Sequence, residues 1–459
     1  MKFHFENIGP IKKADLELGD LTIIAGRNNT GKTYLVYTLY GFLNGRVSLG
    51  TEHLRVIQSV DVKQVGKKLR EKGQYKCKIT PDALRAELDA VLSLLARQFS
   101  GRHIASIFSS PPSNFRRSSI KVTFDGSDFE VVDSAEPDSE GENISIEYNG
   151  KNLIFSKKPF EKIPLRHMNW QVSFSYIWFL LGQIPTPFIL SAERFGISLF
   201  YKELDFTKNR LVEILQKMGT DKNKGRAHFS PFMFLDRHAS RYALPIKDNI
   251  DYTRSISDLV KGKGPMQDAK LDDDVKNIMG GYYQSDENEI RFVFGSRKNR
   301  RFDLPLHLAS SSARGLSDLY FYLRHKAEKN QLLIIDEPES HLDTGNQIML
   351  ARMLAHFVHA GIKVLITTHS DYLIKEINNL VMLSSEFEGK EKFLKEHGYD
   401  KREFLCRESL RCYVAEDGQL TRCRVDKFGA YMPVFDEKIN AINKVSNALE
   451  ARLDDTEEE

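Results

Sequence analysis

The sequence predicts an α/β fold with a parallel sheet, because three short apolar segments each end where glycine-rich or polar residues begin. The segments span residues 21–25, 332–335 and 362–366. Such apolar runs are typical of parallel strands that are buried on both faces. Open sheets of this kind bind ligands beyond the carboxyl ends of their strands. We therefore expect the residues after the three segments to share one binding site.

A phosphate-binding loop is predicted directly after the first segment. The loop reads Gly26-Arg27-Asn28-Asn29-Thr30-Gly31-Lys32-Thr33, and the residues after it can continue as a helix. In a loop with this spacing, backbone N–H groups surround the β-phosphate and Lys32 reaches the β- and γ-phosphate oxygens. The Thr33 hydroxyl completes the shell of a Mg²⁺ ion. The sequence therefore predicts that residues 26–33 bind a nucleotide with Mg²⁺.

Two carboxylates follow the second apolar segment. Asp336 is expected to hold Mg²⁺ through water, and Glu337 to polarise the attacking water. The alternative is a strand that ends in an acidic turn. The phosphate-binding loop in the same chain favours the catalytic interpretation.

His369 comes directly after the third strand, whose predicted span is 362–368. An imidazole at this point can donate a hydrogen bond to the γ-phosphate. A single histidine after a strand is more often structural. Its spacing from Asp336 favours the role at the phosphate.

A serine-rich helix start lies upstream of the second strand. Ser310, Ser311 and Ser312 precede the apolar helical positions of residues 316–323. Serine is a good N-cap residue, and the first turn of a helix has free N–H groups. On its own this segment is better explained as a capped helix.

In chain order, residues 26–33, 310–316, 336–343 and 369 resemble the Walker A, signature, Walker B with D-loop, and switch-histidine motifs of ABC-type ATPases. Residues 3–11 resemble the first strand of the SMC/RecF/OLD branch. Ile189-Leu190-Ser191-Ala192-Glu193-Arg194 is similar to the "PAER" segment of prokaryotic defence ATPases. By pattern, the chain most resembles the PtuA family of ATPase subunits from Septu antiphage systems, with the AriA subunits of PARIS systems related in kind.

The resemblance implies a P-loop ABC-type ATPase head that uses ATP and Mg²⁺. It also implies a dimer or higher homo-oligomer, in which the signature helix contacts the γ-phosphate held by a neighbouring subunit. The signature here is Ser-Ser-Ser-Ala-Arg-Gly-Leu in place of Leu-Ser-Gly-Gly-Gln. Which of the three serines contacts a phosphate stays open.

The head is expected to carry helical insertions, an antiparallel β subdomain and a small C-terminal extension. The expected parts are lobe I with the β subdomain (1–45 and 118–200), two helical insertions (46–117 and 201–284), lobe II (285–380) and the extension (381–459).

Several elements are predicted from periodicity. They are an N-terminal hairpin, a helix over 81–99, and a second helical region over roughly 200–280 with an apolar face at 211–218. Strands are predicted over 120–124, 144–148, 289–294, 404–406 and 410–414, with a closing helix over 439–453. The strands at 120–124 and 144–148 are expected to form the subdomain that carries the adenine.

Composition excludes some classes. Lys+Arg 66 against Asp+Glu 63 gives a net charge of only +3, so no global field attracts nucleic acid. The four cysteines lack a zinc-site spacing, and no apolar run approaches a membrane span, so we expect a cytoplasmic protein. The basic residues at 297–301 could contact DNA phosphates or could form a solvated turn. Arg116 and Arg117 could likewise contact DNA or could simply flank a loop.

No nuclease constellation stands out in the sequence. Asp272 and Asp274 have an Asp-x-Asp spacing, but their apolar neighbours indicate a helix start, where acidic residues are stabilising. A Toprim pair is not found after His369. The nuclease implied by the resemblance is therefore expected on a separate chain, with an HNH nuclease favoured over a Toprim one.

Three functions remain in competition. The first is an ATPase that oligomerises and controls a separately encoded nuclease in antiphage defence. The second is a RecF- or SMC-like repair ATPase that binds DNA directly, and the third is a slowly hydrolysing nucleotide-bound scaffold.

Overall fold

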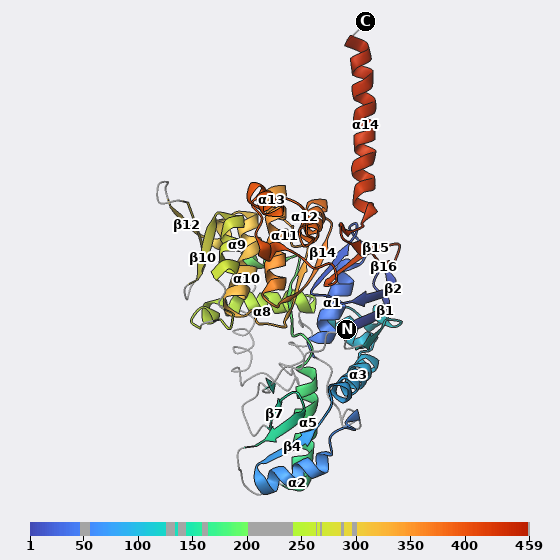
Figure 1. Ribbon diagram of the computed structural model, residues 1–459, viewed down its shortest axis with the longest axis vertical. Helices are drawn as coiled ribbons and strands as arrows, with labels where there is room; N and C mark the ends of the chain where they lie inside the picture. Colours follow the sequence, from blue (N-terminus) through green and yellow to red (C-terminus); the bar gives the residue numbers. More distant parts are fainter. Residues whose placement is uncertain are drawn as a thin grey trace, which may run out of the picture.

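The computed structural model describes residues 1–45, 56–124, 134–135, 144–157, 164–200, 242–262, 264–266, 269–285, 289–295 and 301–457. The apolar helix face predicted at 211–218 and most of the basic cluster at 297–301 lie outside these ranges. The described part is a mixed α/β head with an arm at one end and a projecting C-terminal helix at the other (Figure 1). This confirms the predicted fold class.

A nine-stranded sheet forms the centre of the head. Its order is β5 (Ser119–Thr123), β1 (Lys2–Ile8), β2 (Ile11–Glu17), β16 (Gln419–Arg422), β15 (Leu410–Glu416), β3 (Leu21–Ala25), β14 (Lys363–Thr368), β13 (Leu332–Asp336) and β9 (Pro187–Leu190). Strands β15, β3, β14, β13 and β9 run parallel to one another. The predicted N-terminal hairpin is confirmed, because β1 and β2 pair antiparallel.

The parallel strands are buried on both faces, as their apolar runs predict. Alternate side chains of β3 point into different cores: Ile23 belongs to one apolar cluster and Ile24 to the other. Helix α1 (Lys32–Leu43) packs in the cluster with Ile24. Helices α10 (Ser311–His325), α11 (Thr344–His359) and α12 (Asp371–Met382) pack in the cluster with Ile23.

A separate small sheet builds the arm at the bottom of Figure 1. Its order is β4 (Gln74–Lys78), β8 (Asn152–Ser156), β7 (Ser145–Tyr148) and β6 (Ser134–Ala135). Helices α2 (Val62–Lys72) and α5 (Leu165–Leu181) complete the arm. Helix α3 (Pro81–Gln98) packs beside β5 of the central sheet, where the Ser93 hydroxyl donates to the Val122 carbonyl at 3.5 Å. The predicted helix at 81–99 is thereby confirmed.

The expectation that strands 120–124 and 144–148 form one subdomain is wrong. Strand β5 pairs with β1 in the central sheet, whereas β7 pairs with β6 and β8 in the arm. Alternation of apolar and polar residues identifies a half-buried strand, but it does not identify the partner strand.

The described part of the predicted helical insertion at 201–284 is mainly helical except at its end, where β10 (Gly281–Ser285) begins. Helices α8 (Leu244–Leu259) and α9 (Ala269–Met279) precede a three-stranded sheet of β10, β11 (Ile290–Phe294) and β12 (Phe302–Pro305). Strand β11 confirms the strand predicted over 289–294. Short helices α4 (Gly101–Ile107) and α13 (Lys390–His397) add to the two apolar clusters, with Ile104 in the cluster of α1 and Leu394 in that of α11 and α12.

The C-terminal residues take part in the head. Strand β15 lies between β3 and β16 in the central sheet, although residues 381–459 were expected to form an extension. Residues 404–406 are not a strand, so that prediction is wrong; Leu405 instead caps α12 by donating its N–H to the Leu380 carbonyl at 3.1 Å. Helix α14 (Pro433–Glu457) confirms the predicted closing helix and projects from the body (Figure 1).

Candidate nucleotide-binding site

The loop between β3 and α1 requires glycine at two positions. Gly26 has φ 149°, and a Cβ there would lie 2.6 Å from the Ala415 carbonyl oxygen of β15. Gly31 has φ 93°, and a Cβ there would lie 2.8 Å from Cγ1 of Ile11. Both positions favour the left-handed backbone that only glycine adopts without strain. The close approach of β15 and β2 therefore fixes the shape of the loop.

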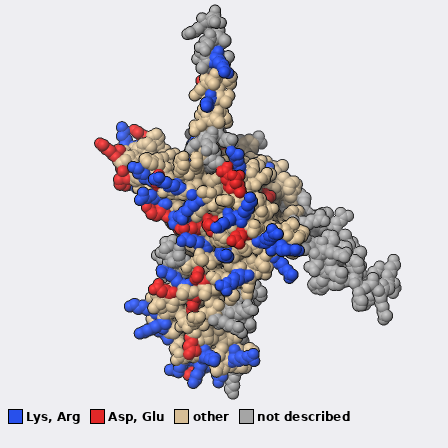
Figure 2. Space-filling model, turned by 90° about the vertical axis from the view of Figure 1, so that its right-hand side faces the viewer, with Lys and Arg blue, Asp and Glu red and all other residues tan. Residues whose placement is uncertain are grey.

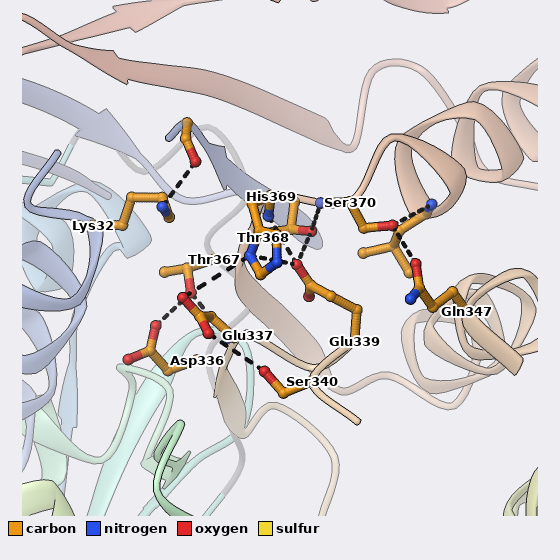
Figure 3. Close-up of polar contacts among 12 residues, drawn as sticks. Lys32, Asp336, Glu337, Glu339, Ser340, Gln347, Thr367, Thr368, His369 and Ser370 are labelled. Atoms are coloured by element: carbon orange, nitrogen blue, oxygen red, sulfur yellow. Dashed lines mark hydrogen bonds and ion pairs between the residues drawn. The ribbon is translucent and has the colours of Figure 1, made fainter. Parts of the chain in front are cut away.

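Lys32 is the cation of this loop. It is buried, and its Nζ donates to the carbonyl oxygens of Gly26 and Arg27, each at 2.8 Å. Burial lowers the pKa of Lys32, while the carboxylates of Glu337, Asp336 and Glu339 act in the opposite direction. The carboxylates at and after the end of β13 are therefore near enough to act on the Lys32 charge, while its ammonium is bonded to main-chain carbonyls (Figure 3).

Asp336 ends β13 and is fully buried. The Thr367 hydroxyl of the adjacent strand β14 donates to Oδ1, whereas Oδ2 has no hydrogen-bond partner among the described residues. Burial raises the pKa of Asp336 to about 6, although the hydroxyls of Thr367 and Thr33 act to lower it. A buried carboxylate oxygen without a partner is costly unless a cation binds it. Asp336 and Thr33 together offer the oxygen ligands that Mg²⁺ prefers.

Glu337 is held in an unusual backbone conformation. Its φ is 50°, and its N–H donates to the Thr367 hydroxyl at 3.0 Å. The Ser340 hydroxyl donates to its Oε2 at 3.3 Å, and its side chain is 29% exposed. Non-glycine residues with positive φ are uncommon and recur at functional sites. The carboxylate is thereby fixed at the edge of the site, where water can reach it.

His369 is oriented by Glu339, a residue that the sequence analysis did not single out. The Glu339 carboxylate is buried and its Oε1 accepts from the Thr368 hydroxyl at 2.7 Å and from the His369 N–H at 2.8 Å. The His369 Nδ1 lies 3.3 Å from the same oxygen and 4.0 Å from Oε1 of Glu337 (Figure 3). The signal for Glu339 is its place three residues after Asp336, in the turn that the strand delivers to the site.

Arg194 also has contacts that sequence reasoning missed. It follows β9, is 3% exposed and donates from Nη1 to the Asp336 carbonyl at 2.8 Å and from Nη2 to the Glu337 carbonyl at 2.8 Å. Its Nε donates to the Gly315 carbonyl of α10 at 3.1 Å. The neighbouring Glu193 accepts from the Tyr37 hydroxyl at 3.1 Å. The sequence showed only that these residues resemble a family segment.

The three serines of the signature segment have different surroundings. Ser310 is the N-cap of α10 and accepts from the Ala313 N–H at 3.2 Å. Ser312 donates to the His341 carbonyl at 2.6 Å, which joins α10 to the turn after β13. Ser311 lies 3.4 Å from Nη2 of Arg314. The capped-helix interpretation and a phosphate-facing first turn are both compatible with this geometry.

The structure brings Lys32, Thr33, Asp336, Glu337 and His369 together, because β3, β14 and β13 are neighbours whose carboxyl ends meet at one edge. The remaining loop residues Arg27, Asn28, Asn29 and Thr30 form the turn before α1, where the Thr30 hydroxyl donates to the Arg27 carbonyl at 2.9 Å.

The Asp-x-Asp segment lies elsewhere, on α9. Asp274 contacts Nδ1 of His356 at 2.6 Å, and Asp273 pairs with Lys276 at 2.9 Å. Within the described ranges, no group of three or more His, Cys, Asp or Glu side chains is arranged to hold a metal ion. Helix α9 is therefore explained by packing and ion pairs.

The fold and the site define the class of P-loop ATPases. The loop offers backbone N–H groups and a lysine to phosphates, and the oxygens of Thr33 and Asp336 fit a Mg²⁺ ion. The chain belongs to the AAA ATPase domain family, whose model matches residues 1–374. No curated protein matches the chain.

Several solved structures are similar. The SMC head domain from Thermotoga maritima is 11% identical, with 93% of this chain and 98% of that chain covered and a TM-score of 0.30. The Smc head domain with an extended coiled coil, bound to the C-terminal domain of ScpA and derived from Pyrococcus furiosus, is 10% identical, with 97% and 98% covered and a TM-score of 0.31. The recombination mediator protein RecF-ATPrS is 13% identical, with 92% and 97% covered and a TM-score of 0.32.

Within the part of the chain that the structure describes, no helix combines the length and the apolar composition needed to cross a bilayer.

Proposed function

We propose that this chain binds and hydrolyses Mg²⁺-ATP, and that ATP controls its association with a second copy. The observation that carries the proposal is the meeting of Lys32, Asp336, Glu337 and His369 at one edge of the sheet. A cation, a metal-binding carboxylate, a water-facing carboxylate and an imidazole are the groups that phosphoryl transfer to water requires.

Each residue has one role in the proposed reaction. The Lys32 ammonium exchanges the carbonyls of Gly26 and Arg27 for phosphate oxygens. Thr33 and Asp336 would hold Mg²⁺, which would supply positive charge to the phosphates. Glu337 accepts the proton of the attacking water, because its carboxylate is fixed and partly exposed. The His369 imidazole, held by Glu339, donates to the γ-phosphate.

Association follows from the place of α10. Its first turn carries three serines and begins at the surface, since Ser310 is exposed. A helix N-terminus binds anions, and its N–H groups suit a γ-phosphate held by another copy. We therefore propose a dimer, or a larger assembly of dimers, in which Ser310–Ser312 of one copy complete the site of the other.

The proposed biological role is antiphage defence, in which ATP state controls a separately encoded nuclease, preferably of the HNH type. The support is the family resemblance of the motifs together with the lack of a metal-binding cluster among the described residues. The partner nuclease would be read from the neighbouring gene.

A second candidate function is direct DNA binding, and the charge on the arm favours it. Helix α2 and the edge strand β4 carry exposed basic side chains, and the described residues provide none of them with an ion-pair partner. These are Lys63, Lys67, Arg70, Lys72, Lys76 and Lys78. Figure 2 shows Lys and Arg side chains around the end of the arm, with fewer acidic ones among them. Such a surface suits the phosphates of a nucleic acid.

One set of measurements separates these functions. We expect the purified chain to hydrolyse Mg²⁺-ATP, and the adjacent gene product to cleave DNA only in its presence, at a rate that ATP alters. Hydrolysis without any effect on a partner, combined with tight salt-dependent binding of duplex DNA, would support the second candidate and contradict the first. ATP retained through purification with negligible turnover would support the scaffold alternative.

A further inference from the structure

The Arg194 guanidinium takes no part in the proposed hydrolysis, yet it is enclosed beneath the nucleotide site. It makes four hydrogen bonds to backbone carbonyls. Nη1 donates to Ser191 and Asp336 at 3.1 and 2.8 Å, Nη2 donates to Glu337 at 2.8 Å, and Nε donates to Gly315 at 3.1 Å. All of its nitrogens are therefore used to hold main chain.

The Ser191 carbonyl follows β9, and the other three carbonyls connect two parts of the chain with different roles. Asp336 ends β13 and Glu337 follows it, at the site that binds ATP in the same chain under the proposed function. Gly315 lies in α10, whose first turn serves the neighbouring copy under the proposed function. A second link joins the same two elements, because the Ser312 hydroxyl donates to the His341 carbonyl at 2.6 Å. The turn after β13 and helix α10 are therefore fastened at two points.

The electrostatics keep the guanidinium charged in this buried place. Burial lowers the pKa of Arg194, and the carboxylates of Glu339, Asp336, Asp318 and Glu337 oppose that shift. Asp318 comes from α10 and is itself buried, with Oδ2 accepting from the Thr253 hydroxyl at 3.1 Å. Arginine stays protonated in proteins. The cation thus lies between the carboxylates of the ATP site and one carboxylate of α10.

Arginine is needed because its planar fork reaches acceptors in several fixed directions. A lysine at position 194 has one nitrogen and cannot bond to the carbonyls of Glu337 and Gly315 in the same way. The lost contacts would leave buried carbonyls unpaired and would loosen α10 relative to β13.

We propose that Arg194 is a positioning residue that couples the ATP site of its own chain to the placement of α10. When Asp336 and Glu337 adjust to bound Mg²⁺-ATP, their carbonyls carry the adjustment through Arg194 to Gly315. ATP bound in one copy thereby sets the first turn of α10 for the other copy. This inference rests on the proposed function, because it requires ATP-driven association.

The test separates ATP binding from association. Glu337→Gln, in which hydrolysis is blocked, serves as the parent, and Arg194→Lys is added to it. Mg²⁺-ATP affinity is measured by calorimetry, and association by sedimentation with and without Mg²⁺-ATP. The matched control adds Arg352→Lys, since Arg352 also holds a carboxylate and a carbonyl, those of Glu376 and Gly398, away from the site.

We expect the Mg²⁺-ATP affinity of the double variant Glu337→Gln/Arg194→Lys to lie within about threefold of the parent. Its association with Mg²⁺-ATP present should be weaker than that of the parent by about tenfold or more, in the range of measured coupling between sites. The control double variant Glu337→Gln/Arg352→Lys should match the parent in both ATP affinity and association. If the parent and the Arg194→Lys double variant associate equally well, the inference is overturned. The inference is also overturned if the Arg194→Lys double variant loses ATP binding or fails to fold, or if the Arg352→Lys control loses association to the same extent. Either result would assign Arg194 a merely structural role. A parent that fails to associate with ATP would contradict the proposed function itself.

Discussion

At the residue scale, the candidate ATP site places the buried carboxylates of Asp336 and Glu339 near two buried cations, Lys32 and Arg194. The carboxylates of Asp336, Glu337 and Glu339 act on the Lys32 charge, and an Asp336 oxygen has no hydrogen-bond partner among the described residues. An unpaired buried carboxylate is destabilising, so this arrangement gains from binding a cation. The unpaired Asp336 oxygen is therefore consistent with the proposed Mg²⁺ ligand role of this residue.

Lys32→Ala is expected to weaken Mg²⁺-ATP binding by about 30-fold or more, because removing one partner of a buried charge pair costs roughly 2–5 kcal/mol. Calorimetric titration measures the loss. Lys392→Ala is the matched control, since Lys392 is an exposed lysine on α13. Unchanged affinity in Lys32→Ala would remove this residue from the site.

Asp318 gives a pH-dependent prediction. Burial raises the pKa of Asp318 to about 7, far above the ordinary value of 3.8. The folded state therefore binds a proton that the unfolded chain has released, and this stabilising contribution is lost as pH rises from about 4 to about 7.

Asp318→Asn removes this dependence while keeping the shape of the side chain. The difference in free energy of unfolding, Asp318→Asn minus the unmodified chain, should increase from pH 5 to pH 8 by on the order of a few kcal/mol. Denaturant unfolding at both pH values measures the difference. A relative stability that is flat over this range would show that Asp318 does not titrate there.

At the element scale, the sequence predicted the strands and loops of the ATP site well and the partners of other strands poorly. The apolar runs before Gly26, Asp336 and His369 are each continuous, and only a doubly buried parallel strand explains them. Strand β15 has a similarly buried sequence, but no motif follows it. Its insertion beside β3 depends on pairing over a long sequence separation, which local patterns do not encode.

The contacts of Arg194 and Glu339 lay beyond prediction for a related reason. A charged residue in a sequence is most often exposed. Burial of these two side chains becomes evident only when β9, β13 and β14 are placed side by side. Their importance is visible only from their contacts: Arg194 donates to main-chain carbonyls, and Glu339 contacts the His369 imidazole.

Truncation distinguishes the two parts of the C-terminal region. A chain that ends at residue 400 lacks β15, whose Leu410, Cys412 and Tyr413 are each at most 2% exposed. It should fail to fold, because β3 would lose a neighbouring strand and the Ala415 contact of the loop. Circular dichroism and thermal melting measure this.

A chain that ends at residue 432 removes only α14, where Ile442, Val445 and Leu449 are 66%, 60% and 52% exposed. Its free energy of unfolding should change by about 0.5 kcal/mol or less, as for other surface changes. A folded chain after the longer truncation, or an unfolded one after the shorter, would contradict this description.

At the scale of the whole molecule, ATP hydrolysis and DNA cleavage are proposed to lie on separate chains. The purified protein alone should not cleave plasmid or linear DNA in Mg²⁺ or Mn²⁺, as gel assays would show. The sharpest challenge comes from α9. Cleavage by the chain alone that is lost in Asp272→Ala and Asp274→Ala would place a nuclease site on this helix, where Asp274 contacts His356.

The proposal that this site hydrolyses ATP is tested by comparing the original chain with Glu337→Gln. Mg²⁺-ATP binding and steady-state hydrolysis are measured for both proteins. The account predicts that both bind Mg²⁺-ATP with similar affinity and that turnover by Glu337→Gln falls by about 10²–10⁴-fold, the usual contribution of a general base. Equal turnover by the two proteins would contradict the assignment of Glu337 and, with it, the organisation of this site for ATP hydrolysis.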